Sequence, residues 1–110
     1  MEKIIEALNK IKKDKYPQDD SLFIFTEQIN PVNESSFKLF RKAELSLWFV
    51  KRIKDENKKV KVAYLSYIDR YSDPSIKENL MKSLYINFAA IILDWLSSGG
   101  LQKLIEDGME

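Results

Sequence analysis

The chain has 110 residues, of which 45% are hydrophobic and 32% are charged, and this composition is typical of a folded globular protein. It contains 0 Cys and 0 His, which excludes disulfides, thiolate nucleophiles, zinc ribbons and histidine general bases. The formal net charge is +1, so the overall charge does not indicate a nucleic acid, a membrane or an acidic substrate. We expect a single domain over residues 1–110.

The N-terminal segment MEKIIEALNKIKK distributes its charges along its whole length. A secretory signal peptide would instead place basic residues before an apolar run and a small-residue cleavage site. We therefore expect a cytoplasmic protein.

Residues 2–14 have the spacing of an amphipathic helix. Ile4, Leu8 and Ile11 follow one another at intervals of four and three, which places them on one helix face. Pro17 disfavours helical backbone at the residue before it. The helix is therefore expected to end near Lys15.

Residues 22–29, LFIFTEQI, form a short apolar run between two polar segments. Periodicity alone does not assign such a run. We favour a strand or an extended core segment over a helix, although a lone strand would need a partner and no other segment is clearly predicted to be one.

A long helix is predicted over about residues 35–56, because some twenty residues pass without Gly or Pro. A helical wheel places a core-facing arc on this segment, made of Leu39, Phe40, Ala43, Leu47 and Val50. Leu45 and Phe49 then project among basic residues. Two interpretations of this apolar spot remain open: another segment, such as residues 22–25, covers it, or it is an exposed docking patch.

Residues 57–72 carry two competing patterns. Alternating Lys and Val at residues 58–62 suggests a strand, whereas Val60, Tyr64, Tyr67 and Tyr71 follow one another at spacings of four, three and four. We favour a helix, because Ala63 and Ile68 join the same stripe. The strand remains the alternative.

A second long helix is predicted over residues 74–97. Pro74 suits the first helical position, and Ser72 or Asp73 is expected to cap the helix. Ser97, Ser98, Gly99 and Gly100 are residue types that end a helix. Residues 101–105 are expected to add a short final helix.

The helix 74–97 is apolar around most of its circumference. Its apolar stretch 84–96 is too short to cross a bilayer, and its polar strip is narrow, consisting of Ser83, Asn87, Asp94 and Ser98. Two explanations compete: the helix lies at the centre of the monomer, or a second subunit covers one side of it. The elements together predict an all-α fold, a compact bundle of four to five helices with one short extended or irregular segment near residues 22–29.

The sequence carries no recognisable catalytic constellation. Adjacent carboxylates such as Asp19 and Asp20 need not converge on a substrate, because neighbouring residues point in different directions on a helix. No P-loop, dinucleotide fingerprint, nucleophile elbow or calcium loop is present. We expect no enzyme activity, no cofactor and no metal.

The favoured function is that of a non-enzymatic helical protein–protein interaction or regulatory protein, self-associating as a homodimer through the apolar helix 74–97. Its protein partner is not identified by the sequence, and we expect no membrane association. The predicted interaction residues are Leu45, Phe49, Ile86 and Leu93.

The alternative function is that of a nucleic-acid-binding regulator using the basic segment 51–61. The predicted contacts are Lys51, Arg52, Lys54, Lys58, Lys59 and Lys61, opposed by Asp55 and Glu56. A charge cluster at a junction between two helices is usually a solvated turn. A steep loss of binding with salt would separate the two functions, because phosphate contacts release counterions.

Overall fold

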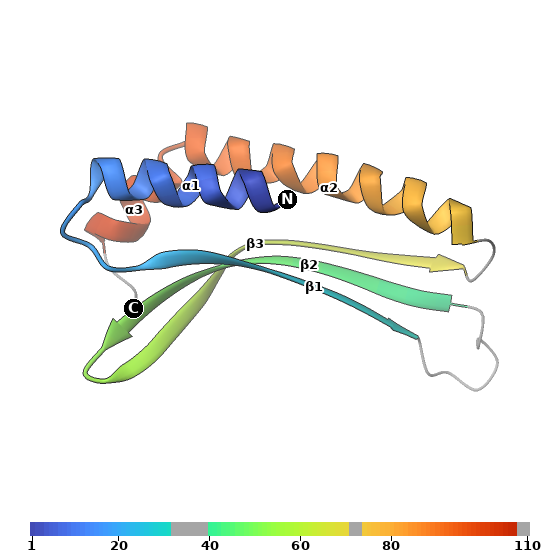
Figure 1. Cartoon of the computed structure of the whole chain (residues 1–110), viewed down its shortest axis with the longest axis horizontal. Helices are drawn as coiled ribbons and strands as arrows, with labels where there is room; N and C mark the ends of the chain where they lie inside the picture. The colour runs from blue at the N-terminus through green and yellow to red at the C-terminus, as the bar shows by residue number, and fades with distance from the viewer. Residues whose placement is uncertain (32–39, 71–73, 108–110) are drawn as a thin grey trace.

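The computed structural model describes residues 1–31, 40–70 and 74–107. Within these residues the elements follow one another as α1 (Glu2–Lys15), β1 (Leu22–Pro31), β2 (Phe40–Ile53), β3 (Glu56–Arg70), α2 (Pro74–Ser97) and α3 (Gly100–Glu106). The strands form one antiparallel sheet in the order β1-β2-β3 (Figure 1). The fold is therefore α+β.

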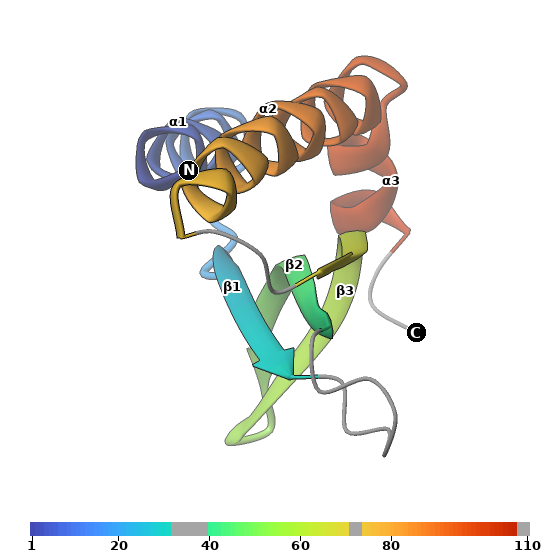
Figure 2. The same cartoon turned by 90° about the vertical axis from the view of Figure 1, so that its right-hand side faces the viewer.

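All the described helices lie on the same side of the sheet. α1 and α2 run side by side above it, and α3 lies near the β3 side (Figures 1 and 2). The molecule is accordingly a two-layer structure, 50 × 27 × 20 Å in extent. The opposite face of the sheet is covered by no described helix or strand.

Strand alternation divides the side chains between these two faces. Leu45, Leu47 and Phe49 point toward the helices and are at most 1% exposed. Phe23 on β1 pairs with Phe49, and their ring centroids are 5.1 Å apart. The core between sheet and helices consists of Leu8, Phe23, Ala43, Leu45, Leu47, Phe49, Ala63, Met81, Leu84, Phe88, Ile92 and Leu101.

A tight turn joins β2 to β3. Ile53 pairs with Glu56, so Lys54 and Asp55 form a two-residue loop, with φ angles of 51° and 66°. Left-handed backbone at both central residues is the geometry of a type I′ hairpin, which favours Asn-Gly. The residues Lys-Asp give no such signal, and for this reason the hairpin is not evident in the sequence.

A bulge interrupts the β2–β3 pairing at its middle. Leu47 pairs with Ala63, but Trp48 pairs with Lys61, so Val62 is an extra residue on β3. Such an insertion changes which face the following residues occupy. Lys61 therefore points to the same face of the sheet as Tyr64.

The predicted all-α bundle is wrong, because β2 and β3 replace two of its helices. Over the described part of residues 35–56, the alternation of apolar residues from Ala43 to Phe49 matches a strand, but Ala43, Leu47 and Val50 also fit the predicted helical arc. In residues 57–72 the helical spacing of the tyrosines is coincidental. Tyr, Val and Ile favour strands, and pairing with β2 decided between the two patterns.

Other parts of the secondary-structure prediction are confirmed. Residues 22–29 lie in β1, in agreement with the preference for a strand or extended segment, and α1 and α2 match the predicted helices. Gly99 has a φ of 83° after α2, the left-handed conformation expected there. The predicted caps Ser72 and Asp73 lie outside the described residues.

Candidate functional site

Two of the predicted interaction residues lie in the core. Leu45 is 0% exposed and Phe49 is 1% exposed, because both point from β2 toward the helices. The expected exposed docking patch is therefore not formed at these residues. The competing interpretation is correct, since Phe23 of residues 22–25 packs against Phe49.

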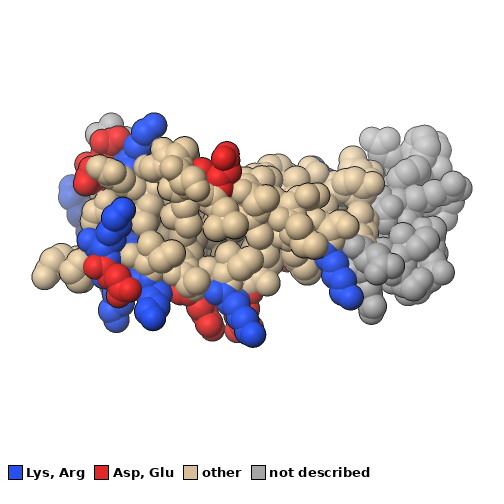
Figure 3. All heavy atoms as spheres, turned by 90° about the horizontal axis from the view of Figure 1, so that it is seen from above, with Lys and Arg blue, Asp and Glu red and all other residues tan. Residues whose placement is uncertain are grey.

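The other two, Ile86 and Leu93, lie on the surface of α2 and are 71% and 59% exposed. Helical spacing of three and four residues places them in one row with Ala90 and Ser97. We call these residues, Ile86, Ala90, Leu93 and Ser97, the outer row. It contains no charged residue. From above, charged side chains gather at the end of the molecule where α1 ends and α3 lies, and the middle of α2 is largely uncharged (Figure 3).

The opposite side of α2 packs on the sheet. Met81, Leu84, Phe88 and Ile92 are buried there, and the Phe88 ring lies 5.9 Å from that of Phe25. Of the two explanations left open, a position at the centre of the monomer does not agree with the structure, because Ile86 and Leu93 on the other side of α2 are exposed. The segment Leu80–Ser97 of α2 has a mean hydropathy of 1.2. By length and composition alone, this segment is long and apolar enough to cross a membrane. Core helices also meet that criterion.

The basic segment 51–61 does not form one patch. Lys51 is paired with Asp19 at 3.3 Å and Arg52 with Asp55 at 3.5 Å, while Lys54 lies in the hairpin turn. Strand alternation turns Lys58 away from the face that Lys59 occupies. Only part of the predicted nucleic-acid contact set, Lys59 and Lys61, lies together with aromatic residues.

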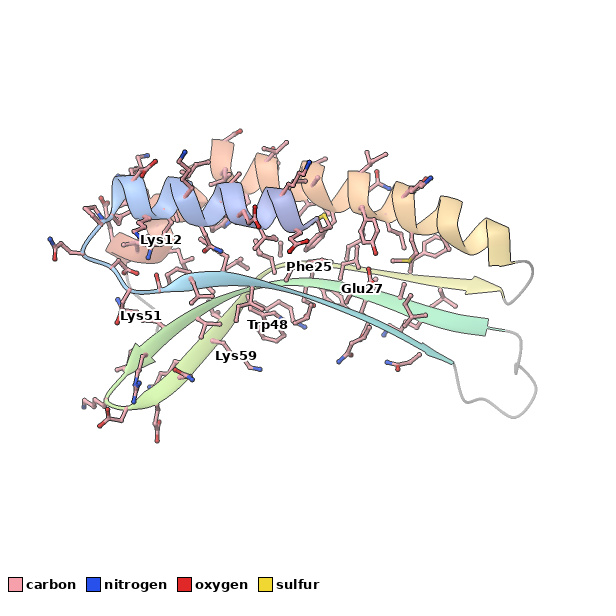
Figure 4. All side chains as sticks on the ribbon, in the orientation of Figure 1. Lys12, Phe25, Glu27, Trp48, Lys51 and Lys59 are labelled. Carbon is pink, nitrogen blue, oxygen red and sulfur yellow. The ribbon has the colours of Figure 1, made fainter. Side chains whose placement is uncertain are left out.

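The register of β2 and β3 places these two lysines on the sheet face that points away from the helices, as Figure 4 shows for Lys59. We call this surface the open face. Its central residues are Leu22, Ile24 and Thr26 on β1, Glu44, Ser46 and Trp48 on β2, and Lys59, Lys61 and Tyr64 on β3.

Trp48 is the centre of the open face. Its indole Nε1 donates a hydrogen bond to Thr26 Oγ1 at 2.8 Å. The ammonium groups of Lys59 and Lys61 each lie 4.9 Å from the ring centroid, and that of Lys61 lies 4.5 Å from the Tyr64 ring. The Lys61 ammonium is therefore in cation–π contact with two rings.

Tyr64 is also held by a hydrogen bond. Its hydroxyl donates to Glu44 Oε1 at 2.9 Å, and Lys42 Nζ lies 3.1 Å from the same carboxylate. The hydrogen bond from Lys42 and then that from Tyr64 hold the pKa of Glu44 below its usual value, and the pKa of Lys42 is raised by the same pairing. The Trp48 and Tyr64 rings are thus oriented by polar contacts at their edges.

A buried polar cluster connects α1 to the start of β1. Lys12 is 3% exposed and donates to the backbone oxygens of Asp19 and Ser21 at 2.5 and 2.6 Å. Burial raises the pKa of the Asp19 carboxyl, but hydrogen bonds from the Ser21 hydroxyl and amide and from Lys12 and Lys51 outweigh it and lower the pKa to about 2. Every member of the cluster is hydrogen-bonded within the chain, so its role is structural.

A second polar contact joins α2 to the sheet. The Tyr85 hydroxyl donates to Glu27. Burial, and then this hydrogen bond, raise the pKa of Tyr85 to about 12. The contact keeps the tyrosine neutral and fixes one side of α2 above β1. In residues 1–31, 40–70 and 74–107, no group of three or more carboxylates is arranged to hold a metal ion.

Trp48, Thr26 and Tyr64 were not predicted as site residues. In the sequence, Trp48 belongs to a continuous apolar run, and such a run does not show which face each residue occupies. The signal that could have identified Trp48 is the alternation of polar and apolar residues over residues 42–49. In a strand this alternation places Trp48 on the other sheet face from Leu47 and Phe49.

Comparison of the chain with known protein families, with curated proteins and with solved structures finds no match.

Proposed function

We propose that this chain is a non-enzymatic protein-interaction domain that forms a homodimer through the outer row of α2. The exposure of Ile86 and Leu93, 71% and 59%, carries the proposal. Isolated apolar residues are common on protein surfaces, whereas exposed apolar side chains in one row with no charge between them form a patch of the kind that interfaces use.

The charges at the ends of the outer row support a second copy as the occupant. Lys82 and Asp94 are both exposed and lie equally far in sequence from residue 88. A two-fold axis beside that residue packs the helices antiparallel, and each charge then lies about 9 Å along the helix from the axis. Lys82 of one copy and Asp94 of the other then lie at the same height on opposite edges of the contact, so both charges stay at its rim.

The sizes of the side chains also match this arrangement. Under the same two-fold axis, Ile86 of one copy lies level with Ala90 of the other. A large side chain opposite a small one allows two helices to approach closely and interdigitate. The covered side of α2 is unaffected, because it already packs on the sheet.

Light scattering of the full chain tests the proposal. The expected mass is about twice 12.9 kDa. Ile86→Glu and Leu93→Glu are each expected to yield monomers, because an unpaired charge is buried at the contact. Their circular dichroism and thermal unfolding, measured at dilutions where the parent is also monomeric, are expected to match the parent.

The matched control is Ile68→Glu, because Ile68 is 58% exposed and lies on the opposite side of the molecule. This variant is expected to remain dimeric. A parent that is monomeric at every concentration contradicts the proposal, as does an α2 surface that binds lipid vesicles in preference to a second copy.

A further inference from the structure

The open face differs from an ordinary solvated sheet face in how its lysines are placed. Within the described part of the chain, Lys12, Lys42, Lys51 and Arg52 each have a carboxylate within 4.0 Å, whereas Lys59 and Lys61 form no such pair. Their ammonium groups lie against the Trp48 and Tyr64 rings instead. Two cations without a carboxylate within 4.0 Å therefore meet two aromatic rings.

We propose that the open face binds single-stranded nucleic acid, with Trp48 and Tyr64 stacking on bases and Lys59 and Lys61 contacting phosphates. Bases stack on aromatic side chains without regard to sequence, and a lysine-lined surface attracts the backbone. Antiparallel sheets that bind RNA use aromatic residues on an uncovered face in this way. The proposal does not depend on the α2 dimer, which would leave the open face of each copy exposed.

The polar contacts at the ring edges support stacking. The bond from Trp48 Nε1 to Thr26 and the bond from the Tyr64 hydroxyl to Glu44 hold the rings by their edges, so that only the lysine ammonium groups need to move for a base to reach a ring plane. A lysine that leaves a ring face for a phosphate exchanges a cation–π contact for a charge pair. A base then occupies the ring face.

Among the central residues of the open face named above, the acidic one is Glu44. It accepts hydrogen bonds from Lys42 and Tyr64, and its charge attracts both Lys42 and Lys61. Together with Lys59 and Lys61, these groups give the central open face a net positive charge. The exposed apolar side chains of Leu22 and Ile24, 45% and 41% exposed, adjoin Trp48 and can contact sugars and bases.

The test is the binding of a fluorescently labelled single strand of about ten nucleotides to the full chain, measured by anisotropy across a range of salt concentrations. Binding is expected to weaken as salt rises. Lys59→Glu with Lys61→Glu should abolish binding at low salt, and replacing both by Gln should reduce the log–log salt slope by about 1.4. The charge-matched control, Lys3→Glu with Lys10→Glu on α1, should retain binding.

Variants of Trp48 separate stacking from simple charge attraction. Trp48→Ala is expected to weaken binding roughly tenfold or more, whereas Trp48→Phe should retain most of the affinity because it keeps an aromatic ring. Binding should quench the intrinsic fluorescence of the parent and not that of Trp48→Phe. Circular dichroism of each variant establishes that the sheet is retained.

Several results would overturn the proposal. These are no binding by the parent at low salt, equal losses for the open-face and α1 charge variants, or unchanged binding by Trp48→Ala. Polyglutamate that competes as well as the single strand, without quenching Trp48, would instead identify a surface for acidic proteins. Duplex DNA bound as tightly as the single strand would show phosphate attraction alone.

Discussion

The two faces of the sheet are built by the same strands but meet different surroundings. On β2, Leu47 and Phe49 are at most 1% exposed beneath the helices. Trp48, between them in sequence, lies on the open face among a hydroxyl group and two ammonium groups. Successive residues of a strand point to opposite faces of the sheet. A shift of the strand pairing by one residue would therefore move the core side chains to the surface and the surface side chains to the core. Register, rather than hydrophobicity, decides what an aromatic residue does here.

The same substitution on the two faces should produce the largest contrast. Leu47→Ala removes a side chain that is 0% exposed, whereas Leu22→Ala removes one that is 45% exposed on the open face. We expect a loss of about 2–5 kcal/mol in the free energy of unfolding for Leu47→Ala and under about 1 kcal/mol for Leu22→Ala. Urea denaturation measures both. Equal losses would mean that the open face is buried in solution.

The pH dependence of stability tests the polar cluster beside the sheet, in which Asp19 forms ion pairs with Lys12 and Lys51. The pKa of Asp19 is lowered to about 2 in the folded chain, so its stabilising contribution is present above pH about 4 and is lost as pH falls toward 2. We expect Asp19→Asn to cost on the order of 1–2 kcal/mol at neutral pH, after allowance for solvent screening.

The stability difference between parent and Asp19→Asn should therefore shrink between pH about 4 and 2. Denaturation at a series of pH values measures it. Asp20→Asn is the matched control, because Asp20 is exposed and is expected to change little. A difference that stays constant down to pH about 2 would contradict the role given to the Asp19 carboxylate.

The β2–β3 turn sets the register that separates the two faces. Lys54 and Asp55 both have positive φ, which is unfavourable for residues with a side chain. Lys54→Asn with Asp55→Gly is expected to raise the free energy of unfolding by about 1 kcal/mol, because Asn-Gly suits a type I′ turn. Thermal unfolding measures the change. A decrease in stability would contradict the assigned turn geometry.

The smallest effect is expected on the open face itself. Thr26→Val removes the acceptor of the Trp48 Nε1 hydrogen bond and should cost under about 1 kcal/mol, because both groups can bond to water. The Trp48 fluorescence spectrum should change, whereas Thr26→Ser should leave it near that of the parent. Identical spectra for Thr26→Val and the parent would show that the indole is not held by Thr26.

Local signals predicted the helices well and the strands poorly. Pro17 and Pro74 mark helix boundaries through backbone geometry, and Gly99 marks another through its left-handed conformation, so each acts without distant partners. The segments that became β2 and β3 satisfy both a helical stripe and an alternation. Their ladder hydrogen bonds come from other strands, and a single segment does not reveal whether such partners exist.

The candidate surfaces likewise divide into residues predicted from local signals and residues that depend on strand pairing. Ile86 and Leu93 were predicted from the periodicity of one helix, and both lie on its exposed side. Leu45 and Phe49 were predicted on a helix surface, but their segment is a strand in which both residues face the core. The grouping of Trp48 with Lys61 depends on the bulge at Val62, which reverses the alternation along β3 and leaves no signal in the sequence.

By itself, the sequence determined the positions of α1, α2 and α3, the absence of cysteine and histidine chemistry, and the apolar character of α2. These properties follow from composition and from interactions between residues a few positions apart. Only the tertiary structure decided that residues 40–53 and 56–70 are paired strands, that one side of α2 is exposed, and that Lys59, Lys61, Trp48 and Tyr64 share a face. The physical reason is that strand pairing, bulges and helix packing join residues distant in sequence, and the free energy of those contacts outweighs local preference.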